Sequence, residues 1–162
     1  IDGQNLHLGT TQNGWKVDLL RFRVYLKDKY RIDEAYYYLG YVSEDEQGLY
    51  SNLQKAGFIV CFKEHNPILL GQKKGNVDTD IVFEIMKNLI DNKDLTKVLV
   101  VSGDGDYKKV IDYLILKNKF SKILFPNKKF ASSLFRKLGS EYYDFIDNLK
   151  STIEYKKKSD RK

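Results

Sequence analysis

The sequence is poor in cysteine, whose disulfides stabilise many small secreted domains. It has a single cysteine among 162 residues, so no disulfide can form within one chain. Cys61 lies in the apolar run at residues 58–62, which makes it a candidate core residue. Neither of the two histidines lies in a pattern typical of a general acid–base pair. A reducing, cytoplasmic location is the expectation that follows from this cysteine usage.

Long hydrophobic runs are absent as well. No run approaches the ~20 apolar residues of a membrane span, and no signal-peptide pattern opens the chain, so we expect no membrane association. Hydrophobic residues make up 42% and charged residues 31%, which is typical of one globular domain. The net charge of +6 is uneven, because residues 156–162 hold five Lys/Arg and one Asp. We interpret this basic tail as a solubilising end.

Short apolar runs of strand length alternate with helix-like segments. The expected strands are residues 35–42, 58–62, 98–101 and 122–125. The expected helices are residues 15–27, 44–55, 79–92, 107–118 and 131–138. This alternation predicts βαβ units with a mostly parallel central sheet. The expected fold class is therefore a three-layer α/β/α domain.

Acidic residues occur at three places where strands end or helices begin. They are Asp2, the pair Asp78 and Asp80, and the pair Asp104 and Asp106. Right-handed crossovers bring all strand-to-helix loops of a parallel sheet to one edge, so these acids should converge there. An acid that closes a strand needs residues before it. We therefore expect that the first strand is truncated in this sequence.

Helical spacing distinguishes the two acids that open the helix at residues 79–92. Its apolar stripe includes Ile81 and Ile85. Asp78 extends that stripe by one turn and should point inward, as a direct metal ligand. Asp80 lies about 200° around the helix axis from Asp78 and aligns with Glu84 on the polar side. We expect Asp80 to face solvent or to act only through another ligand.

Each acid also has a simpler structural interpretation. Asp78 and Asp106 suit helix N-caps, worth ~1 kcal/mol each, and Asp104 between two glycines suits a turn. Crowded carboxylates raise one another's pKa, however, and a bound cation removes that penalty. Oxygen ligands favour Mg²⁺ or Mn²⁺. A calcium loop is excluded, because the twelfth position counted from Asp104 is Ile115 rather than glutamate.

Three ordered motifs resemble those of the NYN family, in its LabA-like branch, within the PIN-like nuclease superfamily. They are Asp2-Gly3-Gln4-Asn5-Leu6, Lys74-Gly75-Asn76-Val77-Asp78 with a further acid at position 80, and Ser102-Gly103-Asp104-Gly105-Asp106-Tyr107. The resemblance covers residues 1–147, which we expect to form a PIN-like nuclease domain. Residues 148–162 are expected to be the end of a C-terminal helix and the basic tail.

The resemblance implies metal-dependent cleavage of RNA, with single-stranded RNA as the expected partner. By position, the family's acidic set corresponds to Asp2, Asp78, Asp104 and Asp106, and its amide to Asn5. Carboxylate-bound metal would activate a water, and Asn5 would orient a ligand or that water. The expected RNA contacts are Lys73, Lys74 and Tyr107.

Two other functions compete with this one. A catalytically silent RNA-binding or regulatory module would keep the fold but lose motif acids, and here all are present. A haloacid dehalogenase-type phosphohydrolase needs two aspartates separated by one residue after the first strand, but position 4 is Gln. The sequence leaves open the RNA sequence, endonucleolytic or exonucleolytic action, the number of metals, and whether the chain forms a homodimer.

Overall fold

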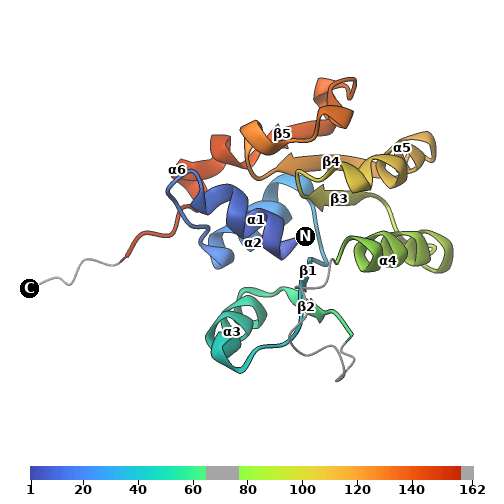
Figure 1. Cartoon of the computed structure of the whole chain (residues 1–162). Helices are drawn as coiled ribbons and strands as arrows, with labels where there is room; N and C mark the ends of the chain where they lie inside the picture. The colour runs from blue at the N-terminus through green and yellow to red at the C-terminus, as the bar shows by residue number, and fades with distance from the viewer. Residues whose placement is uncertain (65–76, 158–162) are drawn as a thin grey trace, which may run out of the picture.

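The computed structural model describes residues 1–64 and 77–157 of the chain (Figure 1). The strands are β1 (Tyr36–Leu39), β2 (Ile59–Phe62), β3 (Val98–Val101), β4 (Phe120–Phe125) and β5 (Tyr143–Phe145). The helices are α1 (Gly3–Thr11), α2 (Leu19–Tyr30), α3 (Gln47–Ala56), α4 (Asp78–Asp91), α5 (Lys108–Leu116) and α6 (Lys150–Ile153). No helix of this described part is long and apolar enough to cross a membrane.

The first two residues join two parallel sheets. Strand β1 pairs with β2, while β3, β4 and β5 form a second sheet in that order, and every one of these pairings is parallel. Between the sheets, the Tyr38 N–H donates to the Ile1 carbonyl at 2.9 Å, and the Asp2 N–H donates to the Val101 carbonyl at 3.1 Å. Ile1 and Asp2 therefore place β1 beside β3 in one continuous arrangement.

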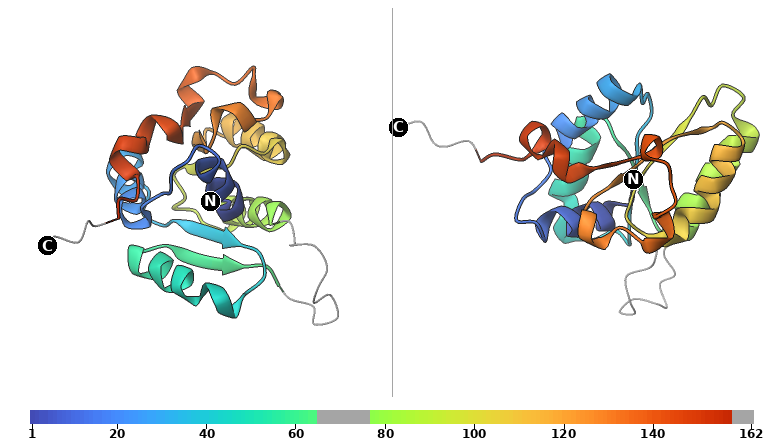
Figure 2. Two further views of the ribbon diagram at one scale, coloured as in Figure 1. Left: turned by 60° about the vertical axis from the view of Figure 1, so that its left-hand side comes forward. Right: turned by 90° about the horizontal axis from the view of Figure 1, so that it is seen from above.

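Helices cover both faces of this arrangement. Figure 2 shows α4 and α5 on one side and α1, α2 and α3 on the other. Successive strand residues enter different cores: Tyr37 and Val101 pack on the side of α1 and α2, whereas Tyr38 and Val100 pack on the side of α4 and α5. Burial on both faces explains why these strands are continuously apolar. The predicted three-layer α/β/α fold is confirmed.

Most predicted elements are present with shifted ends, but one predicted helix was wrong and two elements were not predicted. Helix α1 was not predicted, because its sequence contains two glycines and two threonines and lacks a clear apolar period. Strand β5 was also missed, since it is only three residues long and half-buried. The predicted helix at residues 131–138 is instead a single 3₁₀ turn, Ser133–Phe135. The Ser132 hydroxyl accepts the Leu134 N–H at 3.3 Å, a local bond that competes with helix formation.

Glycine at position 3 allows α1 to begin against β1. A Cβ there would lie 2.4 Å from Cε1 of Tyr37 and 2.7 Å from the Tyr38 carbonyl oxygen. Both neighbours are held by the sheet, so a larger side chain would push α1 away from it. The close approach matters for function, because α1 carries Asn5 and is capped by Asp2.

We predict that Gly3→Ala lowers the free energy of unfolding by about 1–3 kcal/mol, the usual cost of overpacking. Gly48→Ala is the matched control, because Gly48 also lies early in a helix and a Cβ there meets nothing within 4 Å. That control should gain about 0.5–1 kcal/mol from helix propensity. Urea unfolding of both variants measures the difference. Equal effects of the two substitutions would contradict the packing of α1 described above.

Candidate metal centre

Three aspartates from two separate parts of the chain meet at the carboxyl end of the sheet. Asp78 is the first residue of α4, and Asp104 and Asp106 follow β3. One carboxylate oxygen from each lies within 4.8 Å of the other two. Asp78 is buried, Asp104 is half-buried and Asp106 is exposed. The cluster therefore has a buried inner side and an outer side that solvent can reach.

Asp78 points into the protein, as its helical spacing predicted. It is 8% exposed, and Ile81 on the next turn is 4% exposed. The hydroxyl of the buried Tyr107 donates a hydrogen bond to the Asp78 carboxylate. The alternative that Asp78 is an N-cap is wrong, because Val77 occupies that position and α4 has no side-chain cap. The Asp78 carboxylate is instead held against the third motif.

Asp80 points in a different direction. Its side chain is 47% exposed, and its carboxylate lies 3.7 Å from Nζ of Lys63. It does not belong to the group of three clustered aspartates. Its place on the polar side of α4 agrees with the expected rotation of the helix.

The loop after β3 holds Asp104 and Asp106 in fixed positions. The Asp104 carboxylate accepts the Asp106 N–H at 3.0 Å and so caps the 3₁₀ turn Gly105–Tyr107. The turn role expected for Asp104 is therefore real and coexists with its place in the cluster. Asp106 lies inside the turn and is not a cap. A Cβ at Gly105 would lie 2.6 Å from the Ser132 hydroxyl oxygen, so this loop also packs tightly against residues after β4.

The first motif supports the third by hydrogen bonds. Asp2 caps α1 by accepting the Asn5 N–H at 2.9 Å, and it also accepts the Ser102 hydroxyl at 3.3 Å. The Asn5 side-chain carbonyl accepts the Gly103 N–H at 2.8 Å. Asp2 lies outside the group of three. Asp2 and Asn5 thus fix the two residues that precede Asp104.

Ser102 was not singled out from the sequence, although its role in this network is clear. It is fully buried, and besides bonding Asp2 it accepts the Asp104 N–H at 3.1 Å. The available signal was a small polar residue directly after the apolar run of β3. A buried hydroxyl needs partners, and in this protein the acidic loop provides them.

Burial shapes the protonation of two groups beside the cluster. It raises the pKa of the Asp2 carboxyl, and the nearby Asp78 charge adds to the rise, while the Asn5 N–H opposes it. Burial also raises the pKa of Tyr107, and its hydrogen bond to Asp78 acts in the same direction. Tyr107 therefore stays protonated and remains a hydrogen-bond donor to Asp78.

Tyr107, one of the expected RNA contacts, does not reach the protein surface. Its side chain is 0% exposed and packs in the core beside α5, so the prediction that its ring stacks on RNA is wrong. The hydroxyl has a carboxylate partner inside the fold, which accounts for the ring turning inward. Lys73 and Lys74 lie outside the residues that the structure describes.

The donor set fits a hard divalent cation. All three groups offer carboxylate oxygens, the ligand type preferred by Mg²⁺ and Mn²⁺. Within residues 1–64 and 77–157, no Lys or Arg forms an ion pair with Asp104 or Asp106. The exposed side leaves room for the water ligands that Mg²⁺ retains. The three aspartates could therefore hold a metal ion.

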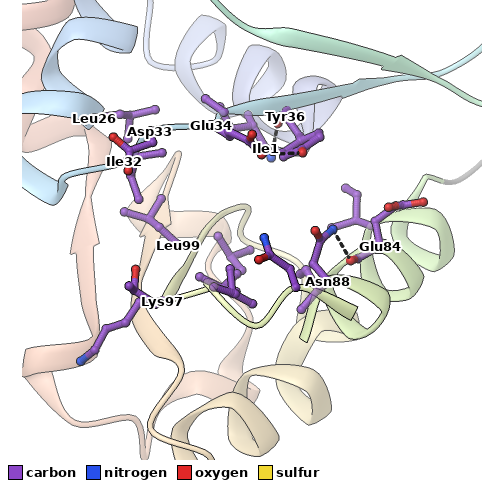
Figure 3. Close-up of a pocket in the computed structure, with 18 of the residues that line it drawn as sticks. Ile1, Leu26, Ile32, Asp33, Glu34, Tyr36, Glu84, Asn88, Lys97 and Leu99 are labelled. Atoms are coloured by element: carbon purple, nitrogen blue, oxygen red, sulfur yellow. Dashed lines mark hydrogen bonds between the residues drawn. The ribbon is translucent and has the colours of Figure 1, made fainter. Parts of the chain in front are cut away.

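A cavity of about 340 Å³ lies apart from this cluster, between β1 and β3 (Figure 3). Ile1, hydrogen-bonded to the Tyr36 carbonyl at 2.8 Å, forms part of one wall. Leu99 and Asn88 lie across from it. None of the three clustered aspartates lines the cavity, although Asp2 and Tyr107 do. The cavity therefore reaches the buried residues behind the three aspartates and does not open on their exposed side.

The family profile described as the NYN domain matches residues 1–147. The chain belongs to the NYN domain family. Among curated proteins, it is 28% identical over 163 residues to the Low amplitude and bright protein LabA of Synechococcus elongatus. That alignment covers 95% of this chain and 85% of LabA. The resemblance read from the three motifs is thereby confirmed.

A solved structure shows the same fold. It is the crystal structure of a protein of unknown function from Vibrio parahaemolyticus, with a TM-score of 0.69. The likeness covers 95% of this chain and 92% of that protein at 18% identity, so it bears on the fold alone. Membership of the NYN family places the chain in a nuclease-like superfamily, and its three clustered aspartates fit the divalent-metal dependence of such nucleases.

The bond from Tyr107 to Asp78 generates a testable prediction. Tyr107→Phe removes one donor from a buried carboxylate, and bonds to charged groups are worth about 1.5–3 kcal/mol. We expect the free energy of unfolding, measured with EDTA present, to fall by that amount. Tyr113→Phe is the control, because that ring lies on α5 and is 39% exposed. Equal stability of the two variants would show that the hydroxyl does not hold Asp78.

Proposed function

We propose that this protein is a metal-dependent ribonuclease that hydrolyses phosphodiester bonds in single-stranded RNA, with Asp78, Asp104 and Asp106 binding Mg²⁺ or Mn²⁺. The observation that carries the proposal is the convergence of these three carboxylates within 4.8 Å. A cation bound there would lower the pKa of a water to make it a nucleophile and would stabilise charge that develops on the phosphate.

The remaining residues of the site hold this arrangement in place. Tyr107 fixes the inner carboxylate by donating to Asp78, and Ser102 and Asn5 fix the loop that carries Asp104. Such support matters because catalytic groups that are misplaced by even 1 Å lose much of their effect. Asp2 completes the acidic set from the buried side, next to Asp78. We propose that it acts there as a further metal ligand or orients one.

The exposed side of the cluster is the side from which a substrate can approach. Asp106 is exposed and Asp104 half-buried, so a phosphate group can reach metal held there without any rearrangement of the core.

We place this activity in the cytoplasm, consistent with a chain whose one cysteine is a free thiol. Burial raises the pKa of that Cys61 thiol, which disfavours the reactive thiolate.

The first experiment is an RNA cleavage assay with Mg²⁺ or Mn²⁺. Asp104→Asn should reduce cleavage to the level seen without protein, since an amide is a far poorer cation ligand than a carboxylate. The fold should survive, because Asn caps a turn as well as Asp does. Asp112→Asn is the matched control: this exposed carboxylate lies on α5, pairs with Lys108 and is outside the cluster.

Cleavage by Asp104→Asn at the wild-type rate, or by the wild type in EDTA, would overturn the proposed chemistry. Binding of RNA by the wild type without any metal-dependent cleavage would instead favour a catalytically silent RNA-binding or regulatory module. Retention of Asp78 and Asp106 speaks against that alternative, because neither of these acids caps a helix or turn.

A second experiment compares the two acids at the start of α4. Asp78→Asn should weaken Mn²⁺ binding by more than about 100-fold, whereas Asp80→Asn should cost no more than the ~10- to 100-fold known for groups outside the ligand set. Both variants keep an oxygen acceptor, so neither should unfold. Calorimetric titration with Mn²⁺ measures the two affinities. A larger loss for Asp80→Asn would mean that Asp80 is a direct ligand.

A further inference from the structure

Residues 128–137, a segment between β4 and β5, lie directly on the acidic loop. The Ser132 N–H donates to the Gly103 carbonyl at 2.9 Å. A Cβ at Gly103 would lie 3.4 Å from the Phe130 carbonyl oxygen, and one at Gly105 would lie 2.8 Å from Cδ1 of Leu134. This segment therefore contacts the residues on both sides of Asp104.

Two large apolar side chains of this segment remain in solvent. Phe130 is 61% exposed and Leu134 is 58% exposed, whereas Phe135 beside them is only 5% exposed and packs on Phe125 at 5.4 Å between ring centroids. Of these three side chains, the fold therefore buries Phe135 and leaves Phe130 and Leu134 largely in solvent. The fold gains little from Phe130, because almost two thirds of its surface stays in water.

The backbone that carries Phe130 is nevertheless well anchored. The Phe130 N–H donates to the Asn127 carbonyl at 3.3 Å. Asn127 is 3% exposed, and its amide donates to the Gly9 carbonyl at 3.1 Å. Its side-chain oxygen also accepts the Lys129 N–H at 2.9 Å. An exposed ring on a fixed backbone is a preorganised surface, and such surfaces lose little entropy when a ligand binds.

The charge of the segment suits a polyanion. Residues 128–137 contain no acidic side chain and four basic ones, all exposed: Lys128, Lys129, Arg136 and Lys137. Lys128 also lies over the Phe145 ring, with 5.6 Å from Nζ to the centroid. Basic groups interleaved with an exposed aromatic ring are the combination with which proteins bind single strands, the ring stacking on a base.

We infer that Phe130 stacks on a nucleobase of a single-stranded RNA whose adjoining phosphate lies at a cation held by Asp104 and Asp106. The inference rests on the proposed function for the position of that phosphate. Stacking on a ring is tolerant of sequence, because every base has a π-face, so this contact selects unpaired strands rather than a particular sequence. Paired bases are stacked on one another and cannot cover the ring.

Binding of a labelled eight-nucleotide oligoadenylate, followed by fluorescence anisotropy with EDTA present, tests this contact apart from cleavage. Phe130→Ala should weaken binding by roughly 5- to 100-fold, the range known for base–aromatic stacking. Phe130→Tyr should restore it. Phe83→Ala is the matched control, because Phe83 is 62% exposed but lies on α4, outside this segment. The decisive comparison uses an abasic oligonucleotide of equal charge, on which Phe130→Ala should have no effect.

Equal binding of oligoadenylate by wild type and Phe130→Ala would overturn the inference, as would an equal loss on the abasic strand. Failure of the proposed function gives a different pattern. In that case the wild type does not cleave RNA with Mg²⁺ or Mn²⁺, yet the base-dependent effect of Phe130→Ala is still observed. If the wild type binds neither oligonucleotide in EDTA and also fails to cleave RNA with Mg²⁺ or Mn²⁺, both the stacking contact and the RNA substrate are excluded.

Discussion

Repulsion among three carboxylates is the constraint on which the rest of this structure depends. Two unit charges 4 Å apart repel by about 1 kcal/mol in bulk water and about 4 kcal/mol near a protein surface. The fold keeps Asp78, Asp104 and Asp106 within 4.8 Å of one another despite this cost. A divalent cation bound there would reverse the sign of the interaction, and we propose that the crowding serves to bind one.

The fold maintains the cluster by attaching its three acids to two separate elements, α4 and the loop after β3. Asp78 begins α4, whose buried face packs in the core on one side of the sheet. The loop of Asp104 continues β3 and is bonded to Asn5 of α1, which packs on the other side. The cluster therefore depends on both helical layers. Gly3 lets α1 come close enough to β1 for Asn5 to reach Gly103.

Periodicity and chain topology predicted the parts of the structure that follow from local rules. The parallel sheet between two helical layers follows from continuous apolar runs alternating with amphipathic segments. The inward rotation of Asp78 follows from its spacing to Ile81. Convergence of the second and third motifs follows from right-handed crossovers. In each case the prediction needed only a short stretch of sequence and a general rule of geometry.

Tertiary contacts decided what the sequence could not predict. Helix α1 has a weak apolar pattern, yet it forms because Asp2 caps it and the sheet supports it. Tyr107 follows an acidic motif and was predicted to contact RNA. Its hydroxyl instead donates a hydrogen bond to Asp78, and its ring is buried. Residues 131–138 have a helix-like pattern, but Ser132 bonds the Gly103 carbonyl instead. Each of these outcomes depends on a partner far away in the sequence.

Anomalous diffraction from crystals soaked in Mn²⁺ tests most directly whether a cation lies between the three clustered aspartates. We expect an anomalous peak within bonding distance of carboxylate oxygens from Asp78, Asp104 and Asp106, with waters completing the coordination. The peak should vanish in Asp104→Asn crystals. Mn²⁺ bound only elsewhere on the protein, with the three carboxylates turned apart, would contradict the account.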